Sequence, residues 1–307
     1  MTISAGIGIA NYPFEDARSF WQWVDLCDSG GVDSIWQSDR LIGRDANLEC
    51  MSVMAALAGG TRRIKFGMNV ASLGLRDPVI TAKACATIDV LSEGRLLPAF
   101  GVGSALSNDY VATGIPTKGR GQRASEGLEI LSRLWAEESV SFSGKHYQLM
   151  EASICPRPVQ QPLPLWVGGT APAAVERTAR LGTGWQAGLE TAEQVKPVVD
   201  AIKARTTELG RSIDEDHYGA GIGFRLGSPD DAVVVRQREG LRKRLGRDPE
   251  GLLAVGGVDA VMERIGEYRA AGIHKFVLRP IAHGAEDVLS QTRQMIEKIL
   301  PEVANLS

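Results

Sequence analysis

The segment Ile64–Gly103 reads IKFGMNVASLGLRDPVITAKACATIDVLSEGRLLPAFGVG and joins two apolar β-type runs through one amphipathic stretch. It predicts strands near Ile64–Val70 and Leu96–Val102, with a helix over Pro78–Leu91 between them. Asp77 is a helix-capping residue that precedes a proline at the first helical position, where no backbone donor is needed. A strand, a helix and a second strand in this order are typical of a parallel βαβ unit.

The same alternation continues along almost the whole chain. Six more strands are expected near Ile3–Ile9, Asp33–Gln37, Leu165–Gly168, Gly184–Ala187, Tyr218–Arg225 and Lys275–Arg279. Seven more helices are expected near Asp16–Ser29, Leu48–Gly59, Arg120–Ala136, Pro172–Leu181, Ala192–Leu209, Asp259–Ala271 and Glu286–Ile299. Because about eight strand–helix units close a barrel, the sequence predicts an α/β protein with a single (β/α)8 TIM barrel over residues 1–307. A doubly wound open sheet is the main competitor, although no GxGxxG turn opens the first helix.

Two segments interrupt this rhythm. Val140–Leu149, VSFSGKHYQL, alternates in polarity around a Ser-Gly turn and predicts a small β-hairpin outside the barrel. Leu226–Gly256 is polar and charged, and it forms an insertion after the seventh strand. A solvated helix with its connections is one interpretation of this insertion. A lid over the barrel mouth is the other, because the segment follows a strand on the face where barrels place active sites.

Composition limits the classes of partner. The chain has 307 residues, 44% of them hydrophobic and 23% charged, with a formal net charge of −3. Neither a nucleic acid nor a membrane is therefore an expected partner. The four cysteines are far apart and form no CxxC pair, and the N-terminal residues do not have the pattern expected of a signal peptide. These features predict reduced thiols in a soluble, cytoplasmic protein.

Several common barrel chemistries are missing. The chain has only four histidines, and no two of them have metal-ligand spacing. Lys65 and Lys275 fall at strand starts, away from the mouth, and no GxSxG motif is present. The sequence thus predicts no metal site, and it favours an organic cofactor as the source of reactivity.

The segment Leu165–Trp185, LWVGGTAPAAVERTARLGTGW, carries the strongest functional pattern. Gly168 and Gly169 let the backbone approach a ligand closely, and Thr170 adds a hydroxyl group. The helix that follows directs its free amides to the same point, which is the usual arrangement of a phosphate site. A Gly-Gly turn followed by an ordinary helix cap is the alternative interpretation.

Other candidates also lie at predicted strand ends, where barrels bind ligands. The cofactor-binding candidates are Asp39, Ala71, Ser72, Gly103, Ser104 and Arg279, and the catalytic candidates are Asp39, Asn108 and Asp109. Each has a plainer interpretation. Asp39 and the adjacent Arg40 could form a surface ion pair, and the Gly101–Gly103 region could be only a turn. Arg279 could bind a phosphate or an anionic substrate, or pair with a nearby carboxylate.

At this point the chain resembles the bacterial luciferase-like superfamily of flavin-dependent monooxygenases and deazaflavin-dependent oxidoreductases. The resemblance rests on an ordered set of stretches that covers nearly everything except Leu226–Gly256. The set includes GGVDSIWQSDRL, TRRIKFGMNVASLGLRDPVITAKACATIDVLSEGRL, FGVGSALSNDYVATGI, PRPVQQPLPLWVGG and VMERIGEYRAAGIHKFVLRP.

The resemblance implies a barrel, often dimeric, with the flavin or deazaflavin ring at the carboxyl-terminal mouth. It also implies that Asp39, the Ala71–Ser72 backbone and the polar residues after the GVG motif approach the ring, and that Gly168 and Gly169 bind the phosphate. Two departures argue against the sugar-phosphate dehydrogenase branch. Arg40 replaces the histidine of a Ser-Asp-His motif found in many deazaflavin-dependent members, and Leu106 stands where the sugar-phosphate branch has an acidic glutamate.

The leading functional hypothesis is a two-component monooxygenase that takes reduced FMN from a separate flavin reductase and oxidises a small organic substrate. The resemblance also implies a homodimer. The alternative is an oxidoreductase that transfers hydride with the deazaflavin coenzyme F420. A non-catalytic flavin-binding protein of the same fold is a second alternative. A cofactor-free lyase or isomerase is a weaker one, since it would need a base such as Asp39, Asp109 or His283.

Overall fold

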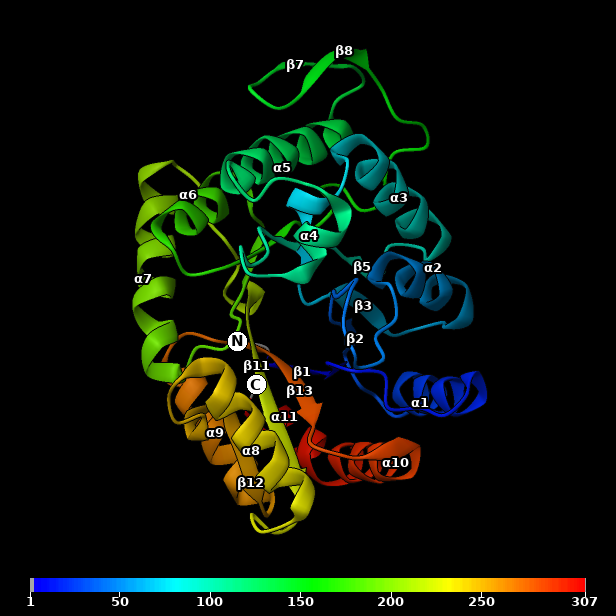
Figure 1. Ribbon diagram of the computed structural model, residues 1–307, viewed down its shortest axis with the longest axis vertical. Coiled ribbons are helices and arrows are strands. Elements are labelled where there is room, and N and C mark those ends of the chain that lie inside the picture. The colour runs from blue at the N-terminus through cyan, green and yellow to red at the C-terminus, as the bar shows by residue number, and fades with distance from the viewer. Residues whose placement is uncertain (1–2, 307) are drawn as a thin grey trace. The chain divides into compact units, whose positions relative to one another are not determined.

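The computed structural model describes residues 3–306, and the described chain divides into two compact units (Figure 1). Unit 1 comprises the chain up to Trp36, Ala187–Ala201 and the chain from Asp214 onward. Unit 2 comprises Gln37–Gln186 and Ile202–Ile213. Each unit contains parallel strands and helices.

The strands of unit 1 are parallel and follow the order β12, β11, β13, β1, β2. Their bounds are β1 (Ser4–Ile9), β2 (Ser34–Gln37, which ends at the first residue of unit 2), β11 (Tyr218–Leu226), β12 (Leu253–Gly256) and β13 (Lys275–Pro280). Lys275 is in register with both Ser4 and Gly219. Most residues of these strands are buried regardless of which face they point to, as is typical of parallel strands covered on both sides.

Helices supply the remaining core of unit 1. Their bounds are α1 (Ala17–Ser29), α8 (Ala232–Leu245), α9 (Val258–Ala270), α10 (Gly284–Gln294), a π-helical turn (Met295–Ile299), α11 (Leu300–Ala304) and the first part of α7 (Ala192–Glu208). Two short 3₁₀ turns, Glu215–His217 and Glu250–Leu252, precede β11 and β12. Helix α1 begins after Asp16 because that carboxylate accepts a hydrogen bond from the Ser19 amide at 2.8 Å.

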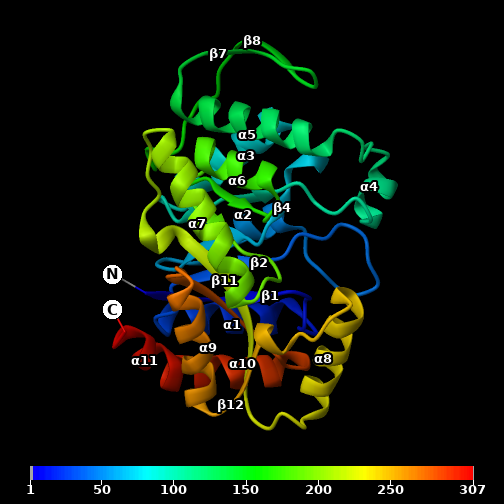
Figure 2. The same cartoon turned by 90° about the vertical axis from the view of Figure 1, so that its left-hand side faces the viewer.

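Unit 2 has parallel strands in the order β4, β6, β9, β10, and β3 pairs in parallel with β5. The bounds are β3 (Lys65–Met68), β4 (Ala71–Ser72), β5 (Leu96–Leu97), β6 (Ala99–Gly101), β9 (Trp166–Gly168) and β10 (Gly184–Gln186). An antiparallel hairpin, β7 (Val140–Ser143) and β8 (Gln148–Ala152), stands apart from these strands. Figures 1 and 2 both place the hairpin on the outer side of α5.

The helices of unit 2 are α2 (Cys50–Gly60), a 3₁₀ turn (Leu73–Leu75), α3 (Pro78–Leu91), α4 (Asn108–Thr113), α5 (Arg120–Ala136) and α6 (Pro172–Leu181). Side-chain caps precede three of these helices, namely α2, α3 and α4. Asp77 caps α3 by accepting hydrogen bonds from the Val79 and Ile80 amides, both at 2.9 Å. Among the described residues, no helix combines the length and the apolar character that crossing a bilayer requires.

The structure confirms the predicted α/β class, the eight predicted strand positions and the hairpin. Two predicted strands differ in detail. The third, predicted to reach Val70, ends at Met68, and after the cis peptide bond at Asn69–Val70 a separate strand, β4, which was not predicted, follows. The fourth is divided at Pro98, which has no backbone donor for a ladder. Closure into a (β/α)8 barrel and a single domain over residues 1–307 stay predictions.

The predicted insertion contains more structure than a solvated helix. Helix α8 lies within Leu226–Gly256, as one interpretation expected, but the segment ends in strand β12, which pairs with β11. The sequence analysis missed β12 because it treated all of Leu226–Gly256 as one polar and charged insertion. The role of this segment as a lid stays a prediction.

Candidate functional site

Strand β9 ends at the glycine pair of unit 2. An added Cβ at Gly168 would lie 2.9 Å from Val70 Cγ2, so this position needs glycine for packing alone. Gly169 has a φ of +114°, which other residues rarely adopt, and its carbonyl accepts a hydrogen bond from Trp185 Nε1 at 2.9 Å. The turn is therefore fixed independently of any ligand.

The helix behind this turn has no side-chain cap. Helix α6 follows the N-cap residue Ala171, whose side chain can accept no hydrogen bond, and begins at Pro172. The alternative of an ordinary helix cap is thus absent at this position. First-turn amides without a side-chain partner are what an anion-binding helix terminus offers.

A buried amide side chain lies beside the glycine pair. Gln186 is the last residue of β10, is in register with Gly168 and is 1% exposed. Neither its Nε2 nor its Oε1 atom has a hydrogen-bond partner among the described residues. An unsatisfied buried polar group costs about 1–3 kcal/mol, so a bound ligand or water is expected to complete it. The sequence analysis missed Gln186, and its signal was a polar residue at the end of an otherwise apolar strand.

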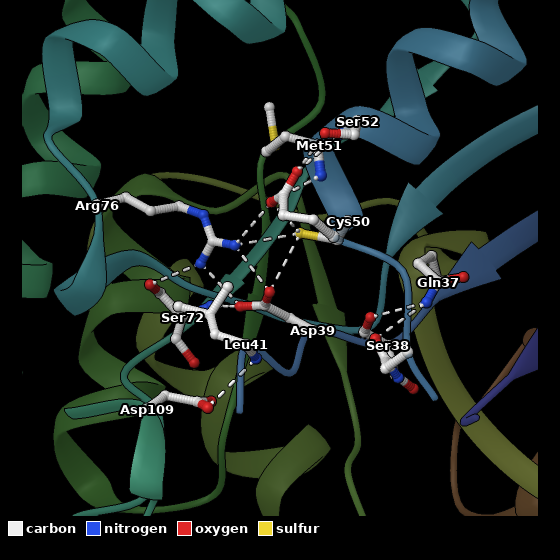
Figure 3. Close-up of polar contacts among 12 residues, drawn as sticks. Gln37, Ser38, Asp39, Leu41, Cys50, Met51, Ser52, Ser72, Arg76 and Asp109 are labelled. Atoms are coloured by element: carbon white, nitrogen blue, oxygen red, sulfur yellow. Dashed lines mark hydrogen bonds and ion pairs between the residues drawn. The ribbon is translucent and has the colours of Figure 1, made fainter. Parts of the chain in front are cut away.

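Asp39 follows β2 and is fully engaged by neighbouring groups (Figure 3). Its carboxylate is 2% exposed and forms a bidentate pair with Arg76, with Oδ1–Nη2 and Oδ2–Nη1 distances of 2.7 and 2.8 Å. The Ser72 amide also donates to Oδ2 at 2.8 Å. Arg40, the expected neighbour, pairs instead with the exposed Asp45. This geometry favours a positioning role for Asp39, which holds the backbone at the Ala71–Ser72 strand.

Arg76 supplies the positive charge for a small acidic cluster. Its Nη2 atom also lies 3.3 Å from Glu49 Oε1 and 3.4 Å from Cys50 Sγ. Burial lowers the pKa of Arg76, but the hydrogen bonds to Asp39 and the nearby acidic groups outweigh it and raise that pKa above its usual value. Burial, with Asp39 beside it, raises the pKa of the Cys50 thiol well above its usual range. The potential metal ligands Asp39, Glu49 and Cys50 thus surround a guanidinium group rather than an open cation site.

The residues after β6 form a second part of the site. Asp109 is 7% exposed and accepts hydrogen bonds from the Leu41 and Ile42 amides at 3.2 and 2.8 Å, so it fastens the loop that follows Asp39. Asn108 and Ser104 are exposed. An added Cβ at Gly103 would lie 2.9 Å from Ser72 Oγ.

Helix α4, which carries two of these residues, was not predicted. Its signals were the Ser107 cap, which accepts from the Asp109 amide, and the left-handed Gly114 after its last residue.

The structure therefore brings most predicted site residues together in unit 2. The Ser72 amide donates to Asp39, and Gly103 lies beside the Ser72 side chain. Asp109 binds the Ile42 amide in the loop after Asp39, and Gly168 lies beside Val70. Arg279 belongs to unit 1, where its side chain faces a separate set of residues. The tryptophans Trp36, Trp166 and Trp185 are buried, as expected for core packing.

Comparison with known proteins identifies the family. The family model for luciferase-like monooxygenases matches residues 2–244. The chain belongs to this family. The chain is therefore an enzyme, and its named relatives include dehydrogenases and monooxygenases.

Several of the curated relatives have the same name. An F420-dependent glucose-6-phosphate dehydrogenase of Amycolatopsis mediterranei (strain U-32) is 28% identical over 94% of this chain and 95% of its own. A protein of the same name from Kineococcus radiotolerans (strain ATCC BAA-149 / DSM 14245 / SRS30216) is 31% identical over 65% of each chain.

Solved structures share the fold. Monooxygenase RslO1 from Streptomyces bottropensis has a TM-score of 0.84 at 22% identity, covering 98% of this chain and 100% of its own. An F420-dependent secondary alcohol dehydrogenase has a TM-score of 0.82 at 17% identity, covering 99% of each chain. These two structures establish the common fold, and the family match agrees with the expectation of a flavin-type oxidoreductase.

The residues of unit 2 fit such a coenzyme. A flavin or deazaflavin coenzyme carries a phosphate and a ring with both donors and acceptors. The uncapped start of α6 beside Gly169 suits the phosphate, and the unsatisfied Gln186 amide offers one donor and one acceptor group to a polar ligand.

Proposed function

We propose that this chain is an F420-dependent oxidoreductase that transfers hydride to or from a small organic substrate. The observation that supports this choice is the similarity, over 94% of the chain, to a protein named as an F420-dependent dehydrogenase. The reduced-FMN monooxygenase, which the sequence analysis favoured, becomes the alternative. The proposal includes closure of the strands into a (β/α)8 barrel and assembly as a homodimer.

Bound F420 would supply the hydride acceptor or donor, and the protein would supply binding and orientation. Gly168, Gly169 and Thr170 would hold the phosphate at the start of α6. The Asp39–Arg76 pair would fix the Ala71–Ser72 backbone against the ring. Gly103, Ser104 and Asn108 would line the same region.

The sugar-phosphate reaction named for the relatives does not follow from this proposal. Arg40 is paired with Asp45 at the surface, and the Leu106 side chain is apolar and 93% exposed. Neither residue can act as the acid or base that the resemblance assigns to those positions. The proposed substrate is therefore a small organic molecule other than glucose 6-phosphate.

Coenzyme titration tests the proposal directly. Purified protein would be titrated with F420, reduced F420, FMN and reduced FMN, following ligand fluorescence. We expect F420 to bind at least about tenfold more tightly than FMN, a difference of about 1.4 kcal/mol. Tight binding of reduced FMN with substrate-dependent oxygen consumption, and no F420 binding, would support the monooxygenase instead. Absence of binding by either coenzyme would refute both.

A capping variant tests the phosphate position. Ala171→Asp places a carboxylate at the start of α6, where it caps the helix and competes with a phosphate for the same amides. We expect a stability gain of about 0.5–2 kcal/mol together with F420 binding at least about tenfold weaker. Gly257→Asp is the matched control, because it caps the equally uncapped helix α9 in unit 1 with nothing within 4 Å of the new Cβ. Unchanged F420 binding in Ala171→Asp would remove the phosphate from this site.

A further inference from the structure

Unit 1 contains a cavity of ≈ 190 Å³ beside the carboxyl-terminal ends of β1 and β13. Helix α8 contributes one wall of this cavity. The polar side chains that line it are Asn11, Gln237, Arg244 and Arg279. Among the described residues that line it, none is acidic. The rest of the lining is mainly apolar and includes Ile9, Leu241, Leu253 and Ile281.

Two glycines make room for the Arg279 side chain. An added Cβ at Gly221 would lie 3.0 Å from Arg279 Nη2, 3.1 Å from Cζ and 3.3 Å from Nε. An added Cβ at Gly8 would lie 3.4 Å from Arg279 Cγ. The guanidinium group therefore lies directly against the Gly221 backbone. Any side chain at residue 221 of β11 would collide with it.

Arg279 has far fewer partners than its donors could satisfy. Its Nη2 atom donates to the Gly221 carbonyl at 3.1 Å, and within residues 3–306 no carboxylate forms an ion pair with it. Burial lowers the pKa of Arg279, and the positive charge of Arg244 acts in the same direction. A guanidinium group has five donors, so most of its binding capacity is available to a ligand.

The neighbouring Arg225 shows how the same fold satisfies a structural arginine. Arg225 lies in β11 and donates to Asp231 at 2.7 Å and to Asp287 at 3.0 Å. Both carboxylates belong to unit 1, so acidic partners are available in this part of the chain. Arg279 has none of them. Since the two arginines differ in this way, the open charge of Arg279 is a local feature of the cavity.

We propose that this cavity binds the carboxylate or phosphate monoester group of a small organic molecule, with Arg279 as its main partner and Arg244 of α8 at the rim. Planar anions of this kind match the paired donors of a guanidinium group. The apolar wall of Ile9, Leu241 and Leu253 would contact the carbon skeleton. We infer that this cavity is the substrate site, which rests on the proposed oxidoreductase function. The substrate would then be an acidic molecule.

Anion binding is testable on the cofactor-free full-length protein. Inorganic phosphate and benzoate would be titrated by calorimetry and by thermal shift at constant ionic strength, with chloride as the reference salt. We expect saturable binding of at least one of these probes. Arg279→Gln should weaken it about 10- to 100-fold, the usual range for a hydrogen bond to a charged group. Arg279→Lys keeps the charge without the paired donors and should give an intermediate loss.

Matched variants identify the site. Arg236→Ala removes a positive charge from the same helix outside the cavity lining and should leave binding unchanged, whereas Arg244→Ala should weaken it. Arg244 is exposed, so this variant folds even if Arg279→Gln does not. Wild-type affinity in both Arg244→Ala and a folded Arg279→Gln would overturn the proposal. So would the absence of saturable binding, or anion binding that is lost only in Ala171→Asp.

The outcome is separable from that of the proposed function. If the protein binds F420 but no anion binds in the cavity, only this inference is refuted. Anion binding through Arg279 with no F420 binding would sink the proposed function and leave an anion-binding cavity of another enzyme.

Discussion

Replacing Arg76 by methionine removes the positive charge that lies among Asp39, Glu49 and Cys50. Asp39 is 2% exposed and Arg76 is 13% exposed, so the pair is shielded from water. The substitution keeps the length of the side chain but leaves the Asp39 carboxylate with the Ser72 amide as its main remaining donor. Breaking a buried pair in this way costs about 3–5 kcal/mol, because the remaining charge is uncompensated.

Thermal and urea unfolding would measure this loss. At about 2–4 °C per kcal/mol for a large domain, the expected fall in Tm is roughly 6–20 °C. Arg40→Met is the control, because Arg40 also pairs with an aspartate but is 36% exposed, and its partner Asp45 is 65% exposed. An exposed pair contributes about 0–1 kcal/mol, so the control should unfold nearly as the wild type does.

A double-mutant cycle isolates the pair itself. Asp39→Asn and Arg76→Met together should destabilise the chain less than the two single changes summed, with a coupling of about 2 kcal/mol. If Arg76→Met costs no more than Arg40→Met, or if the two changes simply add, then the Asp39–Arg76 contact does not stabilise the site. Coenzyme affinity in Arg76→Met should also fall, since the Ala71–Ser72 backbone loses its anchor.

Three further predictions concern single groups. Burial raises the pKa of Glu49, but its hydrogen bonds from the Ser52 and Met51 amides outweigh this and lower that pKa below its usual 4.5. The stability difference between the wild type and Glu49→Gln should therefore be complete above pH 4.5 and shrink as the pH falls through the lowered value, as urea unfolding at several pH values would show; a constant difference would contradict it. In native protein at pH 8, a thiol reagent should modify Cys155, the one exposed cysteine among the described residues, and reach the three buried cysteines only after unfolding; rapid labelling of Cys155→Ser would disprove this. Gln186→Leu should stabilise the ligand-free protein by about 1–3 kcal/mol while weakening coenzyme binding, and a less stable variant with normal binding would show that the amide has a structural role.

Local chemistry explains which elements were predictable. Helix α3 begins at Pro78, as expected, because the Asp77 cap and the proline act on neighbouring atoms. Helix α4 is only six residues long, too short to give a helical periodic pattern, and strand β12 ends a segment that is mostly polar and charged. Contacts with distant residues accompany both elements: Asp109 of α4 accepts from the Ile42 amide, and β12 pairs with β11.

The candidate site residues could be chosen from the sequence, but their pairing could not. Parallel strands bring their carboxyl ends to one edge, so Asp39, Ser72 and Gly168 could be selected from strand ends alone. The partner of Asp39 is 37 positions away along the chain, and only folding brings Arg76 to it. Gln186 was missed for a similar reason. Whether a buried amide side chain finds hydrogen-bond partners depends on the residues packed around it and not on its own type.

Helix α8 has a consequence for how this enzyme can diversify. The helix supplies the rim of the anion cavity, whereas the glycine turn and the start of α6 lie in another stretch of chain and in the other compact unit. If the proposed anion site is correct, substitutions between residues 233 and 244 would alter which acids bind and leave the proposed coenzyme site of unit 2 unchanged. Directed evolution confined to that helix is the economical route to new substrates.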